Sequence, residues 1–297
     1  MMSVPLLSHL GLYSRTAERA ASCVIREYST SFGLATRLLP PPTRAGICNV
    51  YALVRIADEI VDGTAEEAGL DAALRREVLD ALERETLGAL DRGFSTNLVV
   101  HSFALTGRAA GIGTELVHAF FRSMRRDLEP VVQLSEEQYR TYVHGSAEVV
   151  GLMCLRVFLQ DYPVSAEHLL RLEAGAARLG AAFQKINFLR DFAEDSQQLG
   201  RTYFPGTSPG VLGEHRKSEI IADIEADLAE ARRALPLLPA GARRATALAT
   251  ALFAELNKRL RRVDAAAPVH TRVSVPSHVK ARILAETLIT HSPERGS

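Results

Sequence analysis

The segment Tyr51-Ala-Leu-Val-Arg55-Ile-Ala-Asp58-Glu59-Ile-Val-Asp62 decides the fold class, because its polar residues recur with the period of an α-helix. At 100° per residue, one narrow stripe of the helix holds Tyr51, Arg55, Asp58 and Asp62. Most other positions are apolar, and a helix that is apolar nearly all round is expected to be buried. Its polar stripe must then face a cavity or a partner, because unpaired buried charges are costly. Taken alone, the segment fits an exposed face with a weak ion pair equally well.

A second segment has the same character: Gln184-Lys-Ile-Asn187-Phe-Leu-Arg190-Asp191-Phe-Ala-Glu-Asp195. Its amide and carboxylate residues again share one stripe, and aromatic and aliphatic residues flank them. Two buried acidic stripes in one chain need neutralising, which favours a site over two solvated surfaces.

Binding of a diphosphate through Mg²⁺ suits this pair of stripes. Magnesium prefers oxygen ligands, usually takes one or two carboxylates, and completes its shell with water and substrate phosphates. The metal also stabilises a leaving diphosphate as a Lewis acid. Four cations are candidates for the remaining phosphate oxygens: Arg55, Lys185, Arg190 and Arg201. For Lys185 the pattern favours an exposed position, and for Arg201 the two interpretations are even.

The rest of the chain has the helical period throughout and no run typical of strands. This predicts an all-α fold in a single domain spanning residues 1–297, with a flexible tail at 291–297. Helices are expected at residues 15–37, 44–62, 72–90, 98–110, 114–127, 136–159, 166–195, 218–235, 240–263 and 277–290. Residues 63–69 and 91–97 are expected to be surface loops.

Local signals place two helix starts. Thr43, after three consecutive prolines, is a candidate N-cap, because a hydroxyl side chain satisfies a free amide of the first turn. Ser135 stands three residues before Gln138, which is the spacing of a capping box.

Composition excludes several classes of protein. Thirty-five basic residues balance thirty-five acidic ones among the 297 residues, so a general nucleic-acid binder is not expected. The three cysteines form neither a disulfide framework nor a zinc pattern and fit a reducing, cytoplasmic location. No signal peptide and no apolar run long enough to span a membrane are recognised.

The sequence resembles the squalene/phytoene synthases, the head-to-head branch of the all-α isoprenyl synthases. The two acidic segments carry the resemblance, together with three further motifs in order along the chain. These are Ser29-Thr-Ser31-Phe32, Tyr142-Val-His-Gly145-Ser-Ala147-Glu-Val-Val-Gly151 and Leu199-Gly-Arg201-Thr-Tyr203-Phe-Pro205. The resemblance is close over about residues 28–205 and loose beyond them.

The resemblance implies an isoprenoid-synthase-type helical bundle around a deep central apolar channel, with the acidic motifs at its mouth. It implies catalytic roles for Tyr51, Arg55, Asp58, Asp62, Tyr142, Gln184, Asn187, Asp191 and Asp195. The implied Mg²⁺ ligands are Asp58, Asp62, Asn187, Asp191 and Asp195, with Glu59 in support; Mn²⁺ could replace Mg²⁺.

Substrate contacts are implied in the same way. The expected residues are Ser29, Ser31, Phe32, Arg55, Gly145, Ala147, Gly151, Arg190, Arg201 and Tyr203. Gly145, Ala147 and Gly151 correspond to the helix along which the prenyl tails lie, where missing side chains are expected to leave room. Aromatic rings in the reacting region could stabilise carbocations, although core packing is an open alternative for each.

The implied reaction joins two prenyl diphosphates at their C1 ends through a cyclopropylcarbinyl diphosphate. Two geranylgeranyl diphosphates would give phytoene without NADPH. The alternative is a squalene or dehydrosqualene synthase that uses farnesyl diphosphate, and NADPH is expected only if squalene is the product.

Departures from the family pattern bear on the substrate. Thr30 stands where many relatives carry Lys or Arg, which removes one expected phosphate contact. The Gly145-Ser-Ala147 form of the central helix looks more like bacterial phytoene synthases, which favours C20 substrates. The lack of a C-terminal anchor disfavours a eukaryotic-type squalene synthase.

Three other classes of protein stay open. A non-catalytic relative acting as an assembly protein would be expected to lose the motif aspartates, which all stand here. A di-iron bundle would need a second motif like Glu115-Leu-Val-His118. A partner-binding scaffold would leave the acidic stripes unexplained. The basic residues of 258–262 could contact lipid headgroups at the inner face of the membrane, and Arg272 and Lys280 could close over diphosphate.

Overall fold

The all-α fold is confirmed by a computed structural model, which describes residues 8–129, 133–198, 203–207, 212–264 and 273–290, with side chains left out at 193–198. The α-helices are α1 His9–Tyr28, α2 Thr30–Thr36, α3 Pro41–Val61, α4 Thr64–Glu67, α5 Ala72–Arg92, α6 Leu98–Ala110, α7 Thr114–Arg126, α8 Glu136–Val143, α9 Val149–Leu159, α10 Ala166–Gln198, α11 Glu214–Ala234, α12 Ala240–Arg262 and α13 Ser277–Thr290. A π-helical segment, η1 His144–Glu148, joins α8 to α9, and a short 3₁₀ turn, η2 Leu235–Leu237, follows α11.

Of the two predicted helix starts, one is confirmed and the other is wrong. The capping box at Ser135 and Gln138 is confirmed, with both reciprocal hydrogen bonds present. The N-cap at Thr43 is wrong, because α3 begins two residues earlier at Pro41, after Pro40. Proline suits the first helical position, since its missing amide hydrogen has no intrahelical acceptor there.

Three local features differ from the expected pattern. The helix expected at 15–37 breaks at Ser29, which is extended and caps α2 by accepting a hydrogen bond from the amide of Phe32 at 3.2 Å. The loop expected at 63–69 contains the single turn α4. The helix expected at 136–159 is continuous but passes through the π-helical turn of η1. Such turns occur often at functional sites.

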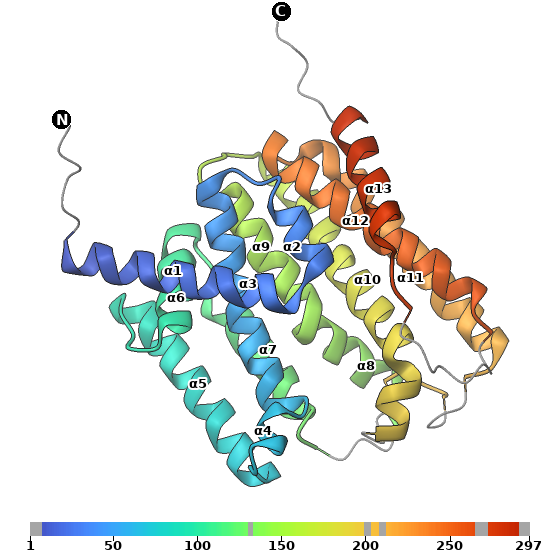
Figure 1. Cartoon of the computed structure of the whole chain (residues 1–297), viewed down its shortest axis with the longest axis horizontal. Coiled ribbons are helices and arrows are strands. Elements are labelled where there is room, and N and C mark those ends of the chain that lie inside the picture. The colour runs from blue at the N-terminus through green and yellow to red at the C-terminus, as the bar shows by residue number, and fades with distance from the viewer. Residues whose placement is uncertain (1–7, 130–132, 199–202, 208–211, 265–272, 291–297) are drawn as a thin grey trace, which may run out of the picture.

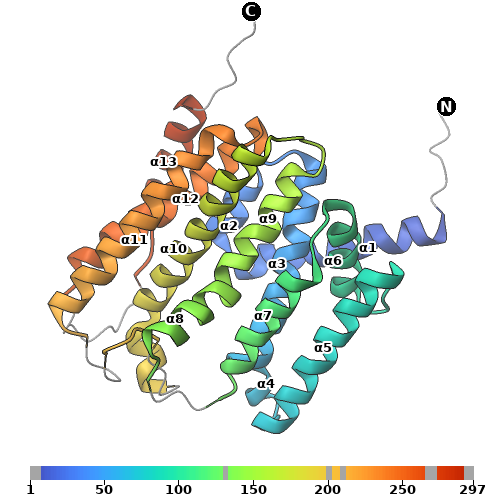
Figure 2. The ribbon, with the colours of Figure 1, turned by 180° about the vertical axis from the view of Figure 1, so that it is seen from behind.

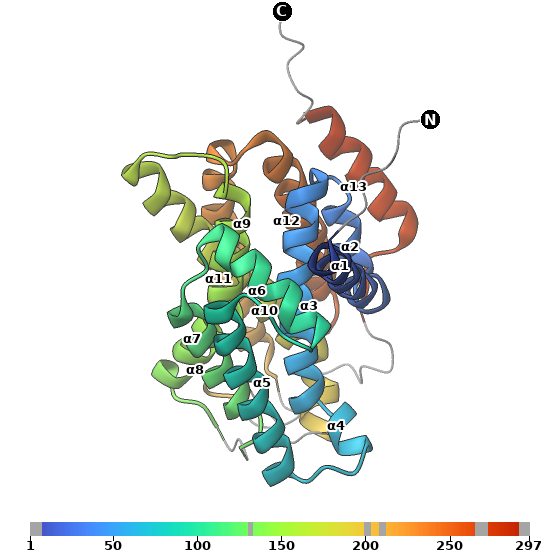
Figure 3. The same ribbon diagram turned by 90° about the vertical axis from the view of Figure 1, so that its left-hand side faces the viewer.

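Two groups of helices pack side by side, as Figures 1 and 2 show. Helices α3, α5, α6, α7 and α9 enclose one apolar core, with Phe103, Phe120 and Phe121 fully buried in it. Helices α10, α11, α12 and α13 run up and down against each other and enclose a second core with α8. Helix α1 lies across α3 and α6 (Figure 1), and Figure 3 shows it nearly end-on.

One helical stretch within the described ranges, Glu136–Leu159, is long and apolar enough by composition to cross a membrane. Half of its most apolar window is buried inside the protein, and core helices of soluble proteins pass the same test.

Candidate active site

The first acidic segment lies on the C-terminal half of α3, next to the serine motif on α2. The ring of Tyr51 stacks on Phe32, with centroids 5.8 Å apart. Burial raises the pKa of Tyr51, and a hydrogen bond with Ser29 works in the opposite direction. The structure therefore brings together the predicted residues Ser29, Phe32 and Tyr51. Ser31 lies half-buried on the same short helix.

Arg55 is anchored on both sides. Its guanidinium pairs with Glu59 one turn along α3, and its Cζ lies 4.4 Å from the ring centroid of Tyr28. Glu59 also accepts a hydrogen bond from Thr64 of α4. The supporting role expected for Glu59 thus has a physical basis, because it fixes Arg55 and ties α4 to α3. A fixed guanidinium is well suited to bind phosphate oxygens.

Asp58 lies among like charges. Burial and the negative charge of Asp62 hold the pKa of the Asp58 carboxyl well above its usual range, and Asp127 adds to the shift. Asp127 is the C-cap residue of α7 and is 6% exposed. Acidic residues of two segments therefore act electrostatically on Asp58, and a divalent cation would relieve their repulsion.

Three stacked rings connect this acidic end of α3 with α10. The rings of Phe188 and Tyr203 lie 4.1 Å apart and nearly parallel, and Tyr142 stacks on Tyr203 at 5.4 Å. The negative charge of Asp62 contributes to the raised pKa of Tyr142, for which burial is the main cause. Tyr142 is therefore influenced by the first acidic segment and stacks on Phe188 of the helix that carries the second.

The second acidic segment occupies the C-terminal part of α10. Gln184, Asn187 and Asp191 are half-buried. The guanidinium of Arg190 binds the neighbouring Asp191, with 2.8 Å between Nε and Oδ1. The side chain of Asp195 and all of Arg201 lie outside the described residues, so their assignments stay predictions.

Lys185 is not the exposed residue that the sequence favoured. Its side chain is 8% exposed, and its ammonium group pairs with Asp223 and Asp227 of α11. The sequence could not show this, because both partners lie about forty residues further along the chain. Lys185 therefore fixes the position of α10 and is not a free phosphate contact.

Gly145 and Gly151 do not leave room for a substrate in this structure. A Cβ at Gly145 would come within 2.0 Å of Ser123 Oγ, and one at Gly151 within 2.3 Å of the Ala176 carbonyl oxygen. Ala147 is buried at a similar close contact, where its carbonyl would lie 2.3 Å from a Cβ added to Gly180. At Gly145 and Gly151 the missing side chains instead let η1 and α9 approach α7 and α10, and the role expected for Ala147 stays a prediction.

Within the described side chains, no three His, Cys, Asp or Glu residues lie close enough together to form a metal site. The donor set nevertheless fits Mg²⁺ in its chemistry, because Asp58, Asp62 and Asp191 offer carboxylate oxygens, the ligands that Mg²⁺ prefers. Assignment of these residues, with Asn187 and Asp195, as metal ligands stays a prediction.

A contact that the motifs did not reveal joins the C-terminal helix to the serine motif. The ammonium group of Lys280 on α13 donates a hydrogen bond to Thr30 Oγ1 at 2.9 Å. Thr30 is the position where a cation was missing from the expected pattern. Lys280 thus supplies a positive charge at the same place from 250 residues away in the chain.

The di-iron alternative loses its support. His118 Nδ1 lies 2.8 Å from Glu83 Oε1, and Glu83 also pairs with Arg125. These contacts tie α7 to α5 and account for the histidine without a metal.

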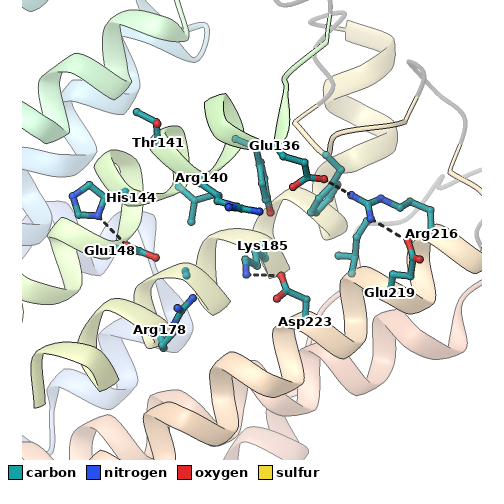
Figure 4. Close-up of a pocket in the computed structure, with 15 residues that line it drawn as sticks. Glu136, Arg140, Thr141, His144, Glu148, Arg178, Lys185, Arg216, Glu219 and Asp223 are labelled. Carbon is teal, nitrogen blue, oxygen red and sulfur yellow. Dashed lines mark hydrogen bonds and ion pairs between the residues drawn. The ribbon is translucent and has the colours of Figure 1, made fainter. Parts of the chain in front are cut away.

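A cleft of about 740 Å³ lies on another face, between α8, η1, α10 and α11 (Figure 4). Its polar side chains are largely paired with each other: His144 hydrogen-bonds Glu148 at 2.9 Å, and Arg216 pairs with Glu219 at 3.0 Å. No described carboxylate of the two acidic segments lines it. We therefore place the candidate active site at the acidic segments and assign no role to this cleft.

Comparison with known proteins shows the family and the fold. The sequence profile of the family described as "Squalene/phytoene synthase" matches residues 25–208. A 15-cis-phytoene synthase from Paracoccus sp. is 33% identical over 195 residues, which cover 61% of this chain and 58% of that protein. A presqualene diphosphate synthase from Zymomonas mobilis is 30% identical over 224 residues, covering 74% of this chain and 69% of that protein.

Among solved structures, a dehydrosqualene synthase crystallised with a ligand superposes with a TM-score of 0.78. The match covers 94% of this chain and 98% of that one at 22% identity, so it shows a shared fold. Against several of the curated phytoene synthases that it matches, the chain spans only 33–58% of their length.

Proposed function

Since this chain belongs to the squalene/phytoene synthase family of prenyltransferases, we propose that it joins two prenyl diphosphates head to head. The observation that carries the proposal is the position of Tyr142 and Tyr203. Tyr142 is influenced by the charge of Asp62 at the end of α3, and its ring stacks on Tyr203 and on Phe188 of α10. This geometry supports convergence of the two acidic segments on one site.

The residues of the site would have three separate roles in this reaction. Asp58, Asp62, Asn187, Asp191 and Asp195 would hold Mg²⁺, which supplies the positive charge that stabilises a leaving diphosphate. Arg55 pairs with Glu59 and Lys280 donates to Thr30, and both cations would bind phosphate oxygens. The stacked aromatic rings would face the allylic cation and stabilise its charge.

For the substrate we propose geranylgeranyl diphosphate, with phytoene as the product, in keeping with the similarity to phytoene synthases. The test offers C15 and C20 prenyl diphosphates with Mg²⁺ and identifies the products by mass. A C40 hydrocarbon formed from the C20 substrate alone, and unchanged by NADPH, is the expected result. A C30 hydrocarbon formed in preference would replace this assignment by a squalene or dehydrosqualene synthase.

A second candidate is a synthase that stops at the cyclopropylcarbinyl diphosphate. The long match to the presqualene diphosphate synthase of Zymomonas mobilis favours it. In the same experiment this candidate predicts a product that keeps one diphosphate and becomes a neutral alcohol after phosphatase treatment. A hydrocarbon formed without phosphatase would exclude it.

We further propose a cytoplasmic protein that contacts the inner face of the membrane, because the product would be an apolar hydrocarbon. The exposed basic residues Lys258 and Arg262 at the end of α12 are candidates for the lipid contact. Co-sedimentation with anionic vesicles, and its loss in the double variant Lys258→Glu/Arg262→Glu, is the expected result. Equal recovery of both proteins in the vesicle pellet would contradict this contact.

A further inference from the structure

Asp127 is a buried carboxylate that belongs to none of the motifs. It ends α7, where the negative end of the helix dipole disfavours a second negative charge. Burial adds to this cost, since the side chain leaves water. Both carboxylate oxygens accept the hydroxyl of Tyr142, at 2.7 Å for Oδ1 and 3.0 Å for Oδ2.

This contact decides what Tyr142 can offer to a substrate. A phenol has one proton, and here that proton points at a carboxylate. Only the oxygen lone pairs and the ring face are left for other partners. The ring itself is fixed, because it stacks on Tyr203 at 15° and on Phe188 at 23°.

The negative charge of Asp127 determines how the hydrogen bond changes the Tyr142 side chain. A phenol that donates to a carboxylate carries more electron density on its oxygen and ring, because the hydrogen bond polarises the O–H bond. Such a group attracts a cation and does not donate to a phosphate oxygen.

We propose that Asp127 is a positioning residue that holds the proton of Tyr142, so that Tyr142 faces the reacting carbons as an electron-rich group. In this role Tyr142 stabilises positive charge on the allylic carbons and does not bind diphosphate. The inference rests on the proposed function, because it assigns a role within a reaction that passes through cations.

Kinetics of four variants test the role. In Asp127→Ala and Tyr142→Phe, kcat should fall by about tenfold or more, while KM for the prenyl diphosphate changes by less than about twofold. The double variant should be no slower than either single variant, because both remove the same interaction. Asp127→Asn keeps an acceptor oxygen but loses the charge, so its kcat should lie between those of Asp127→Ala and wild type. Tyr139→Phe, on the same helix and also buried, is the matched control and should change kcat by less than about twofold.

A raised KM with unchanged kcat in Tyr142→Phe would overturn the proposal, because it would make Tyr142 a diphosphate contact. Additive losses of kcat in the double variant would also overturn it.

A spectroscopic measurement that does not depend on turnover separates failure of this proposal from failure of the proposed function. In ultraviolet resonance Raman spectra, the wild-type minus Tyr142→Phe difference should show a phenol that donates to a strong acceptor. The corresponding difference recorded in the Asp127→Ala background should lose this signature. Absence of the signature in wild type would overturn the proposal even if the enzyme is active.

Discussion

Lys185 Nζ lies 2.7 Å from Asp227 Oδ2, in a buried ion pair that fastens α10 to α11. The pair lies on a different face of α10 from Asp191, six residues further along the helix. Asp227 is also within 3.5 Å of Arg178, and Lys185 has a second acidic partner in Asp223. The helix that carries the second acidic segment is thus held in place by charges that take no part in the proposed chemistry.

Removing the cation from this pair should destabilise the fold. Lys185→Met leaves two acidic side chains without their shared partner, and breaking a buried pair costs about 3–5 kcal/mol. Urea denaturation measures the free energy of unfolding. Arg178→Met is the control, because its side chain is 54% exposed and the loss should stay below about 1 kcal/mol. Equal stability of Lys185→Met and wild type would show that the pair does not hold α10.

The same pair predicts a pH dependence. Burial raises the pKa of Asp227, although the adjacent Lys185 lowers it in part. A carboxyl with a raised pKa in the folded state binds its proton more tightly there than in the unfolded chain. Its contribution to stability is therefore present at low pH and is lost as pH rises from about 3.9, the ordinary aspartate value, through the raised one.

Across this pH range the free energy of unfolding should fall less in Asp227→Asn than in wild type, because the asparagine does not titrate. A steeper fall in the variant would mean that the sign is wrong.

The close contacts of η1 and α9 predict that added side chains destabilise the protein. Gly145→Ala and Gly151→Ala should each cost about 1–3 kcal/mol, because both methyl groups meet backbone or a short side chain. Gly33→Ala is a control inside another helix, where the nearest atom lies 3.7 Å from the new Cβ. In thermal unfolding, the Tm of Gly145→Ala and of Gly151→Ala should lie well below the Tm of the control. If Gly151→Ala were neutral, open space at that position would again be plausible.

The three cysteines should react at very different rates. Cys23 is exposed, whereas Cys48 is buried and burial raises the pKa of the Cys154 thiol to about 12. Only thiolates react quickly with iodoacetamide, so Cys23 should be modified first at neutral pH. Peptide mass spectrometry at increasing times measures the order. Modification of Cys154 as fast as Cys23 would contradict the buried environment.

Much of the fold could be predicted because it depends on local signals. The bounds of α6 and α13 agree with the predicted ranges, since Asn97 caps the start of α6 and Gly111 adopts the left-handed conformation at its end. The π-helical turn could not be predicted, because it accompanies tight packing of Gly145 against Ser123 on another helix.

The candidate site divides in the same way. Helical spacing alone placed the carboxylates of each segment on one face. The partners of Lys185, the contact of Lys280 with Thr30 and the role of Asp127 all join segments that are far apart in sequence or lack a motif. The sequence carries one indication of the role of Asp127: it is an acidic residue at the C-terminal end of a helix, where the helix dipole disfavours a negative charge.

The most direct test of the central claim is product formation from labelled geranylgeranyl diphosphate by wild type, Asp58→Asn and Asp191→Asn. Asp71→Asn is the matched control, because Asp71 is an exposed N-cap and asparagine caps a helix equally well. We predict a Mg²⁺-dependent head-to-head product from wild type and the control, and its loss in both site variants with helicity unchanged. Full turnover by either site variant, or by wild type in excess EDTA, would contradict the claim that the two acidic segments share a metal-bound diphosphate.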